Sequence, residues 1–331
     1  MPARRIRMYL ARRLPPAVEA AMQRRYEVKL NESDVVLTEQ QLIAQAHGCE
    51  YLVVSVTEKL TAQVMDGLAP SLRLIATHSV GFEHIDLDAA RARGIAVLYS
   101  PNVLSAACAE IALMLILNAA RRGHEADTLV RSGRWMGFAP TQLLGLGLVG
   151  RRLGILGMGR IGREVAGRAI GFGMEIHYHN RRRLAPADEG GATYHASVDE
   201  LLGYSDVLCL CVPHDSQVAG LLDSRRISLL PPNAIVVNIA RGSVVDDDAL
   251  IAALKSGRVF AAGLDVFANE PAIDARYRQL PNVFLTPHIG SATTQTRDAM
   301  GFLLLEAMQA LEEGRTPGNY FGATSLSESQ R

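Results

Sequence analysis

A glycine-rich turn near the middle of the chain constrains the fold more than any other stretch. Gly157, Gly159 and Gly162 follow a short apolar strand, precede a helix and have the spacing G-x-G-x-x-G. At this spacing the first glycine permits a tight turn, the second admits a pyrophosphate close to the backbone, and the third lets helix and strand pack together. The helix N-terminus would present free N–H groups to the phosphates. The turn alone is a weak signal, but with its flanking strand and helix it predicts a dinucleotide-binding βαβ unit.

Strand-like and helix-like segments alternate along most of the chain. A length of 331 residues favours two domains, and the alternation predicts that both are doubly wound α/β domains. We expect strands at 5–11, 27–30, 51–56, 72–77, 95–99, 152–156, 174–179, 206–212, 234–240, 261–266 and 283–286. We expect helices at 17–25, 39–47 (with a capping box at Thr38 and Gln41), 61–68, 88–93, 161–170, 198–202 and 247–256, and long helices at 102–122 and 291–313. The segments 123–150 and 314–331 show no periodicity and are expected to be irregular.

The composition excludes several classes of protein. The 34 basic and 34 acidic residues give a formal net charge of zero, so no long-range field attracts nucleic acid or an anionic membrane. No apolar run is long enough to span a membrane. The 4 cysteines form no disulfide framework, and Cys209 and Cys211 alternate within an apolar strand, which predicts buried reduced thiols and no metal site. We expect a soluble protein of a reducing compartment, most simply the cytosol.

The end of the second strand of the dinucleotide unit bears on the choice of coenzyme. An acidic residue at that position hydrogen-bonds the ribose 2′-hydroxyl of NAD. This chain instead has Asn180 followed by Arg181, Arg182 and Arg183. Asn180 carries no charge to repel a 2′-phosphate, and guanidinium groups are matched donors for one. The sequence therefore favours NADP, while NAD use and a merely solvated basic loop stay open as alternatives.

Three polar residues stand after strands of the same unit. Arg241, Glu270 and His288 each follow an apolar segment that we expect to be a strand. Each could be an ordinary surface or turn residue. However, the carboxyl ends of parallel strands line the crevice in which such folds bind ligands. Three such residues in one sheet therefore indicate a site.

Several segments together resemble one enzyme family. The glycine turn 154–162, the stretches 238–246, 263–271 and 287–293, and the loop 80–87 are similar to those of the D-isomer-specific 2-hydroxyacid dehydrogenases. The resemblance runs from about residue 50 to residue 315. Within the family, the Gly-Arg-Trp segment at 133–135 and the non-acidic end of the second strand resemble the glyoxylate/hydroxypyruvate reductase branch.

The resemblance implies a Rossmann coenzyme domain inserted into a flavodoxin-like substrate domain. Residues 1–101 and 290–331 would form the substrate domain, and residues 102–289 would form the NAD(P)-binding domain. The two long helices would be the crossings between them. Family members are typically homodimers, with the first crossing helix and the loop after it at the interface. On that basis Trp135 would reach the active site of the partner.

The resemblance also implies roles for the polar residues. Arg241 would hold the carboxylate of a 2-oxo acid and polarise its ketone oxygen. His288 would donate a proton to that oxygen, and Glu270 would favour the protonated form of the imidazole. Backbone N–H groups of Val80 and Gly81 would bind the other edge of the carboxylate.

The expected contacts follow from these roles. Substrate contacts are assigned to Val80, Gly81, Trp135, Arg241 and His288. Coenzyme contacts are assigned to Gly157, Met158, Gly159, Arg160, Ile161, Gly162, Asn180, Arg181, Arg182, Cys211, Val212, Pro213, Ile239, Ala240, Arg241, Asp265, His288 and Gly290. The stretch 213–218 departs from the family's Pro-x-Thr-x-x-Thr turn, and we interpret His214 and Asp215 there as turn residues rather than a catalytic pair.

We therefore predict an NADPH-preferring reductase of short 2-oxo acids, which converts glyoxylate to glycolate and hydroxypyruvate to D-glycerate. Another D-2-hydroxyacid dehydrogenase, such as a 2-ketogluconate reductase, is an alternative. A second alternative is a dinucleotide-sensing binding protein, similar to the related transcriptional co-repressors. Arg241, Glu270 and His288 favour the enzyme, and a turnover assay separates the two classes.

Overall fold

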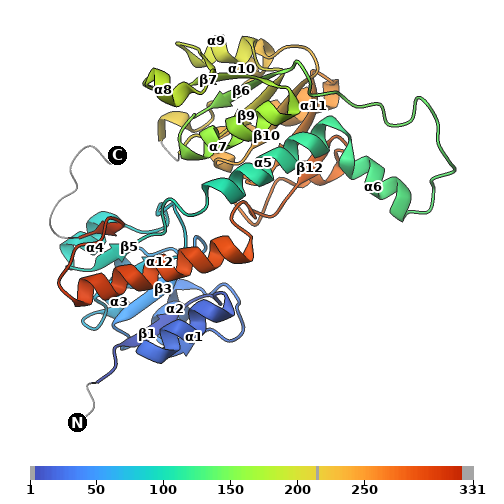
Figure 1. The fold of residues 1–331 in the computed structure, drawn as a ribbon. Coiled ribbons are helices and arrows are strands. Elements are labelled where there is room, and N and C mark those ends of the chain that lie inside the picture. Colours follow the sequence, from blue (N-terminus) through green and yellow to red (C-terminus); the bar gives the residue numbers. More distant parts are fainter. Residues whose placement is uncertain (1–3, 214–215, 323–331) are drawn as a thin grey trace. The chain divides into compact units, whose positions relative to one another are not determined.

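The computed structural model describes residues 4–213 and 216–322, so His214, Asp215 and the end of the C-terminal tail lie outside the described residues. The chain divides into two compact units. Residues 1–104 and 292–331 make up the first unit, and residues 105–291 make up the second. Each unit is built around one largely parallel β-sheet with helices on both faces (Figure 1). The predicted class, with two doubly wound α/β domains, is confirmed.

In the described part of the chain, the sheet of the first unit has six strands in the order β13-β5-β4-β3-β1-β2. They are β1 (Arg7–Leu10), β2 (Glu27–Leu30), β3 (Tyr51–Val54), β4 (Leu74–Thr77), β5 (Ala96–Leu98) and β13 (Tyr320–Phe321). The order β2-β1-β3-β4-β5 is that of flavodoxin-like folds. The short strand β13 pairs antiparallel to β5. It lies in the stretch 314–331, for which the sequence predicts no element because two residues are too few to show a periodicity.

Helices of the first unit pack on both faces of this sheet. They are α1 (Pro16–Arg25), α2 (Glu39–Ala46), α3 (Ala62–Leu68), α4 (Leu87–Ala92) and α12 (Thr294–Glu312). An apolar cluster under α2, α3 and α4 fills one face, and a second cluster under α1 and α12 fills the other. The predicted capping box is confirmed at the start of α2, where Thr38 Oγ1 accepts from the N–H of Gln41 and the Gln41 side chain accepts from the N–H of Thr38.

The described residues of the second unit form a parallel sheet of seven strands in the order β12-β11-β10-β9-β6-β7-β8. They are β6 (Arg152–Leu156), β7 (Glu175–His179), β8 (Thr193–Tyr194), β9 (Val207–Leu210), β10 (Ala234–Asn238), β11 (Val259–Leu264) and β12 (Val283–Leu285). The strand order reverses between β6 and β9, as it does in a Rossmann fold. The sequence predicts six of these strands and misses β8, which pairs with β7 over only two residues.

Two layers of helices cover the sheet of the second unit. Helices α5 (Ser105–Ala120) and α7 (Arg160–Ala169) pack on one face, and α9 (Val198–Gly203), α10 (Ser224–Leu229) and α11 (Asp247–Ser256) pack on the other. A short helix α8 (Pro186–Glu189) follows β7. The 3-10 turns are η1 (Ile170–Phe172), η2 (Ser216–Val218), η3 (Gly242–Val244) and η4 (Ala275–Gln279).

Helix α6 (Gly123–Arg131) corrects the prediction that residues 123–150 are wholly irregular. The long helix predicted at 102–122 ends at Ala120, because Arg122 has a left-handed φ of 53° that turns the chain. The Arg122 guanidinium then forms two bonds of 2.7 Å with the carboxylate of Glu125 in the first turn of α6. None of the residues of α6 is buried, so the helix has no core-facing side that would mark it in the sequence. Residues 132–150 form no helix or strand.

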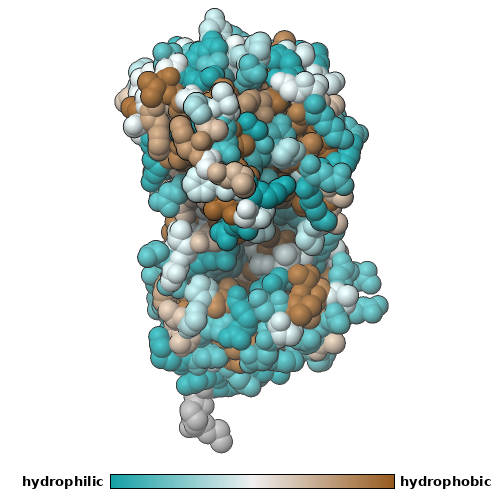
Figure 2. Space-filling view, turned by 90° about the vertical axis from the view of Figure 1, so that its right-hand side faces the viewer, coloured by the Kyte–Doolittle hydropathy of each residue, from teal (hydrophilic) through white to brown (hydrophobic). Residues whose placement is uncertain are grey.

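The surface is mixed in character. Figure 2 shows hydrophilic residues interspersed with small groups of hydrophobic ones on the face that it draws. Several of the most exposed large hydrophobic side chains come from residues 135–149. Among the described residues, no helix is both long enough and apolar enough to cross a membrane.

Candidate active site

The glycine turn has room for a bound anion. A Cβ on Gly157, where φ is 96°, would lie 2.8 Å from backbone atoms of Cys211 and Val212, so the turn packs directly against the end of β9. A Cβ on Gly162 would lie 2.5 Å from the carbonyl oxygen of Gly157. By contrast, a Cβ on Gly159 would meet nothing within 4 Å. Among the described residues, no side chain caps the N-terminus of α7 at Gly159. These features fit the pyrophosphate of a dinucleotide.

Asn180 is bound to the glycine turn itself. Its Oδ1 accepts from the N–H of Met158 at 2.6 Å, and its Nδ2 donates to the carbonyl oxygen of Met158 at 3.3 Å. The N–H of Gly157 also donates to the carbonyl oxygen of His179 at 3.0 Å. The end of β7 therefore holds the turn in shape. The sequence predicts that Asn180 contacts the coenzyme and does not reveal this second role.

The arginines after Asn180 differ in their surroundings. Arg181, Arg182 and Arg183 are all exposed. Arg183 forms two bonds with the carboxylate of Glu189, at 2.7 and 3.1 Å. Tyr178 donates its hydroxyl to the same carboxylate at 2.7 Å. Arg183 and Tyr178 together lower the pKa of Glu189 to about 2. Glu189 thus anchors one end of the basic loop, an arrangement that the arginine run alone does not reveal.

Other residues assigned to the coenzyme follow the neighbouring strands. Cys211, Val212 and Pro213 come directly after β9, and Ile239 and Ala240 come directly after β10. All of them therefore lie at the carboxyl ends of the strands, near the point between β9 and β6 where the strand order reverses. A hydrogen bond with the neighbouring thiol of Cys209 and burial raise the pKa of Cys211 well above its ordinary value, so this thiol stays protonated.

His288 and Glu270 form a close pair. The imidazole Nδ1 of His288 lies 2.8 Å from Oε2 of Glu270, and both side chains are about one-third exposed, at 37% and 32%. The other oxygen of Glu270 accepts from the N–H of Phe267 at 2.8 Å, which fixes the carboxylate. Burial acts to raise the pKa of Glu270, but His288 and the Phe267 N–H outweigh it and lower the pKa below its ordinary value. The pair therefore leaves Nε2 as the ring nitrogen that can exchange a proton with a ligand.

Asp265 shapes the turn that carries His288. The backbone of His288 is left-handed, with φ 52°, an uncommon state for a residue with a side chain. The buried carboxylate of Asp265 accepts from the N–H of Ile289 at 2.8 Å and from the N–H of Gly290 at 2.9 Å. It also accepts from the hydroxyl of Thr286 at 2.7 Å. Burial raises the pKa of Asp265. The sequence predicts that Asp265 lies near the coenzyme and does not reveal its bonds to both sides of the histidine turn.

Arg241 and Glu270 come from loops that pack against each other. A Cβ on Gly242 would lie 1.8 Å from a backbone atom of Phe267, so only glycine lets the loop after β10 approach the loop after β11. Arg241 Nη1 donates to the carbonyl oxygen of Ala240 at 2.8 Å. Its positive charge also contributes to the lowered pKa of Glu270. A cation, an ionised carboxylate and an imidazole are thus gathered at one edge of the second unit.

The remaining substrate assignments fall elsewhere in the chain. Val80 and Gly81 follow β4 in the first unit. Among the described residues, no acceptor meets the N–H of either one, so both N–H groups can bind an anion. Trp135 follows α6 and is 54% exposed. The second unit therefore brings Arg241, Glu270 and His288 together, while the contributions of Val80, Gly81 and Trp135 to one site stay predictions.

Comparison with known proteins decides the family. The family described as D-isomer specific 2-hydroxyacid dehydrogenase, NAD binding domain, matches residues 113–290. The chain belongs to the D-isomer-specific 2-hydroxyacid dehydrogenases.

Relatives of this dehydrogenase align with nearly its whole length. Glycerate dehydrogenase from Hyphomicrobium methylovorum is 41% identical over 303 residues, covering 91% of this chain and 94% of that protein. A crystal structure from Polaromonas sp. JS6 66, described as an NAD-binding D-isomer specific 2-hydroxyacid dehydrogenase, is 56% identical, with a TM-score of 0.94 and coverage of 96% and 100%. The NADPH-dependent glyoxylate/hydroxypyruvate reductase of Sinorhizobium meliloti, solved with NADP and malonate, is 32% identical, with a TM-score of 0.84 and coverage of 97% and 100%. The predicted family and its glyoxylate/hydroxypyruvate reductase branch are confirmed, and the dehydrogenase is an enzyme.

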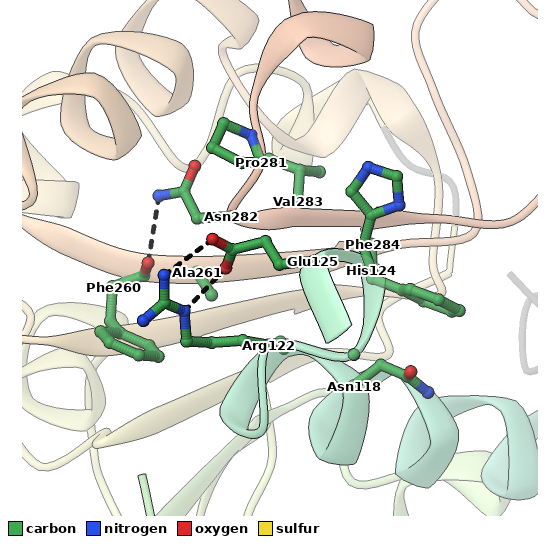
Figure 3. A pocket seen from close by; sticks show the side chains of 12 residues that line it. Asn118, Arg122, His124, Glu125, Phe260, Ala261, Pro281, Asn282, Val283 and Phe284 are labelled. Atoms are coloured by element: carbon green, nitrogen blue, oxygen red, sulfur yellow. Dashed lines mark hydrogen bonds and ion pairs between the residues drawn. The ribbon is translucent and has the colours of Figure 1, made fainter. Parts of the chain in front are cut away.

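A cavity of about 290 Å³ lies away from the catalytic candidates of the dehydrogenase. Figure 3 shows the Arg122–Glu125 ion pair beside it, with Phe260, Pro281 and Phe284 among the other lining residues. Phe260 and Val283 stand at the amino-terminal ends of β11 and β12, whereas Arg241 and His288 follow the carboxyl ends of strands. Because the amino and carboxyl ends of parallel strands lie on opposite sides of the sheet, this cavity is not part of the candidate active site.

Proposed function

We propose that the dehydrogenase is an NADPH-preferring reductase of short 2-oxo acids, with glyoxylate and hydroxypyruvate as its first substrates. The observation that carries the proposal is the His288–Glu270 contact of 2.8 Å, with Arg241 in the adjoining loop. An imidazole held by a carboxylate suits proton transfer to a ketone oxygen, and a guanidinium suits recognition of a carboxylate.

The roles of the three residues follow from their chemistry. Arg241 holds the carboxylate of the substrate and polarises the ketone oxygen without losing its own charge. His288 donates the proton from Nε2 to that oxygen, since Nδ1 is engaged by Glu270. Glu270 orients the ring through its contact with Nδ1. The bound coenzyme supplies the hydride.

The first unit also has groups that suit a carboxylate. Its N–H groups at Val80 and Gly81 have no acceptor among the described residues, and two adjacent N–H groups match the oxygens of a carboxylate. We assign coenzyme binding to the second unit, and the match of residues 113–290 to an NAD-binding family supports this assignment.

Two observations support NADP as the preferred coenzyme. Asn180 carries no negative charge, and Arg181 and Arg182 stand exposed beside it on a loop that Glu189 anchors. The Sinorhizobium meliloti relative was solved with NADP. Exposed guanidinium groups are matched donors for a 2′-phosphate.

A homodimer is the assembly that the surface favours. Helix α6 has no buried residue, and Trp135, Met136 and Phe138 after it are 54%, 95% and 88% exposed. Exposed hydrophobic side chains grouped in one stretch mark an interaction surface, and a second copy of the chain would present the same stretch. Sedimentation of the wild type and of a Met136→Ser/Phe138→Ser variant tests this proposal, which a monomeric wild type would refute.

Initial rates test the activity. Glyoxylate, hydroxypyruvate, pyruvate and 2-ketogluconate are each assayed with NADPH and with NADH. We expect the first two substrates with NADPH to give the highest kcat/KM. The His288→Gln variant should lose about 10²- to 10⁴-fold in kcat while it binds NADPH as the wild type does. Absence of turnover on glyoxylate and hydroxypyruvate, or a strong NADH preference, would overturn the specific proposal.

A further inference from the structure

Below the loop that carries Val80 and Gly81, three polar side chains form one hydrogen-bonded chain. His84 Nε2 lies 3.0 Å from Thr77 Oγ1, and Thr77 Oγ1 lies 2.6 Å from Ser79 Oγ. Ser79 Oγ in turn donates to the carbonyl oxygen of Gly81 at 2.5 Å. Thr77 and Ser79 are both buried.

The direction of each bond follows from counting hydrogens. The one hydroxyl hydrogen of Ser79 goes to the carbonyl oxygen of Gly81, so Ser79 must accept from Thr77. Thr77 has then used its own hydrogen and must accept from His84. The imidazole therefore carries its hydrogen on Nε2 and starts a chain in which every bond points toward Gly81. Aligned bonds of this kind polarise and strengthen one another.

The chain ends on the peptide group that follows the two open N–H groups. The carbonyl oxygen of Gly81 is fixed by Ser79, while the N–H groups of Val80 and Gly81 meet no acceptor among the described residues. The main chain on either side is also fixed, because Ser100 N–H donates to the carbonyl oxygen of Ser79 at 2.8 Å and Leu60 N–H donates to that of His84 at 2.7 Å. The peptide groups before and after the one that joins Val80 to Gly81 are thus both held.

We propose that His84, acting through Thr77 and Ser79, is a positioning residue for the carboxylate of the substrate. The chain fixes the peptide group that follows Gly81, and the Ser100 N–H fixes the one that carries the Val80 N–H, so the peptide between them, which carries the Gly81 N–H, has little freedom to turn before the substrate arrives. Preorganised donors bind an anion better than donors that must first be ordered. This inference rests on the proposed function, because it takes the ligand of these N–H groups to be a 2-oxo acid.

Substitutions at Thr77 provide a matched pair. Thr77→Val replaces the hydroxyl with a methyl group of similar size and breaks the chain in its middle, whereas Thr77→Ser keeps the hydroxyl. We expect Thr77→Val to raise the KM for glyoxylate and the Kd of oxalate, measured by calorimetry on the enzyme–NADPH complex, by about tenfold, the worth of one hydrogen bond to a charged group. The KM for NADPH should not change, and Thr77→Ser should behave like the wild type.

Substitutions at His84 keep the inference testable if Thr77→Val folds poorly. His84→Gln retains an N–H donor and should keep most of the affinity for oxalate, whereas His84→Leu removes the donor and should lose it. Unchanged oxalate affinity in folded His84→Leu and Ser79→Ala variants would overturn the inference, as would an equal loss of NADPH affinity. A wild type that turns over no 2-oxo acid would refute the proposed function instead, so the two failures are distinguishable.

Discussion

Replacing Glu270 with glutamine tests how the candidate acid is controlled. The Glu270 carboxylate contacts His288 Nδ1 at 2.8 Å and is held from its other side by the N–H of Phe267. Its lowered pKa means that it is ionised throughout the working range of pH. Glutamine has nearly the same shape and can still accept a hydrogen bond, so Glu270→Gln removes the charge and little else.

The size of the effect can be worked out from the contact. A hydrogen bond to a charged partner contributes about 1.5–3 kcal/mol, against about 0.5–1.5 kcal/mol for a neutral pair. Both side chains are about one-third exposed, at 37% and 32%, so water weakens the interaction and the lower part of this difference applies. A loss of about 1 kcal/mol of stabilisation at the proton donor corresponds to about a fivefold lower kcat/KM.

The direction of the effect follows from the reaction. Reduction of a 2-oxo acid takes a proton from His288, and Glu270→Gln removes the carboxylate that holds that ring. The kcat/KM for glyoxylate with NADPH should therefore fall about fivefold. The assay compares initial rates of the two enzymes at one pH, with Kd for NADPH as the control. An unchanged kcat/KM in the variant would refute the reasoning.

Three further predictions concern the turns and the basic loop. Gly162→Ala places a methyl group 2.5 Å from a carbonyl oxygen and should raise the Kd for NADPH at least about tenfold. The control is Gly167→Ala in the same helix, where the methyl group meets nothing within 4 Å. It should leave that Kd unchanged and stabilise the protein by up to about 1 kcal/mol in a thermal melt. Asp265→Asn sets an amide N–H against a backbone N–H and should lower kcat for glyoxylate about tenfold or more in steady-state assays. Glu189, whose pKa is lowered to about 2, stabilises the fold above its ordinary pKa and loses that contribution as the pH falls toward 2, so the melting temperature of Glu189→Gln should depend less on pH across this interval.

Much of the fold could be predicted because its elements obey local rules. The bounds of β6 and α11 coincide with the predicted ones, since each combines an apolar pattern with a clear end, the glycine turn for β6 and Asp246 and Gly257 for α11. Helix α6 and strand β8 could not be predicted, for two different reasons. The helix buries none of its residues, and the strand has two residues and exists only through its pairing with β7.

The candidate site also has one part that the sequence predicts and one part that it does not. Arg241, Glu270 and His288 could be found because each carries recognisable chemistry at the end of a strand. The supporting contacts could not be found from sequence, because they join residues far apart in the chain. Thr286 and Asp265 are 21 residues apart, and no periodicity relates them. Contacts of this kind are set by the packing of whole strands, not by local pattern.

The bonds between Asn180 and the backbone of Met158 have a consequence for anyone who wishes to change the coenzyme of this enzyme. The obvious exchange, aspartate for asparagine, supplies a partner for the ribose of NAD but removes the Nδ2 donor that the Met158 carbonyl oxygen now receives at 3.3 Å. The same substitution would set a carboxylate oxygen against that carbonyl oxygen. Selectivity and the shape of the phosphate-binding turn are therefore joined in one side chain, and a redesign for NAD has to supply a new donor to the turn along with the new acid.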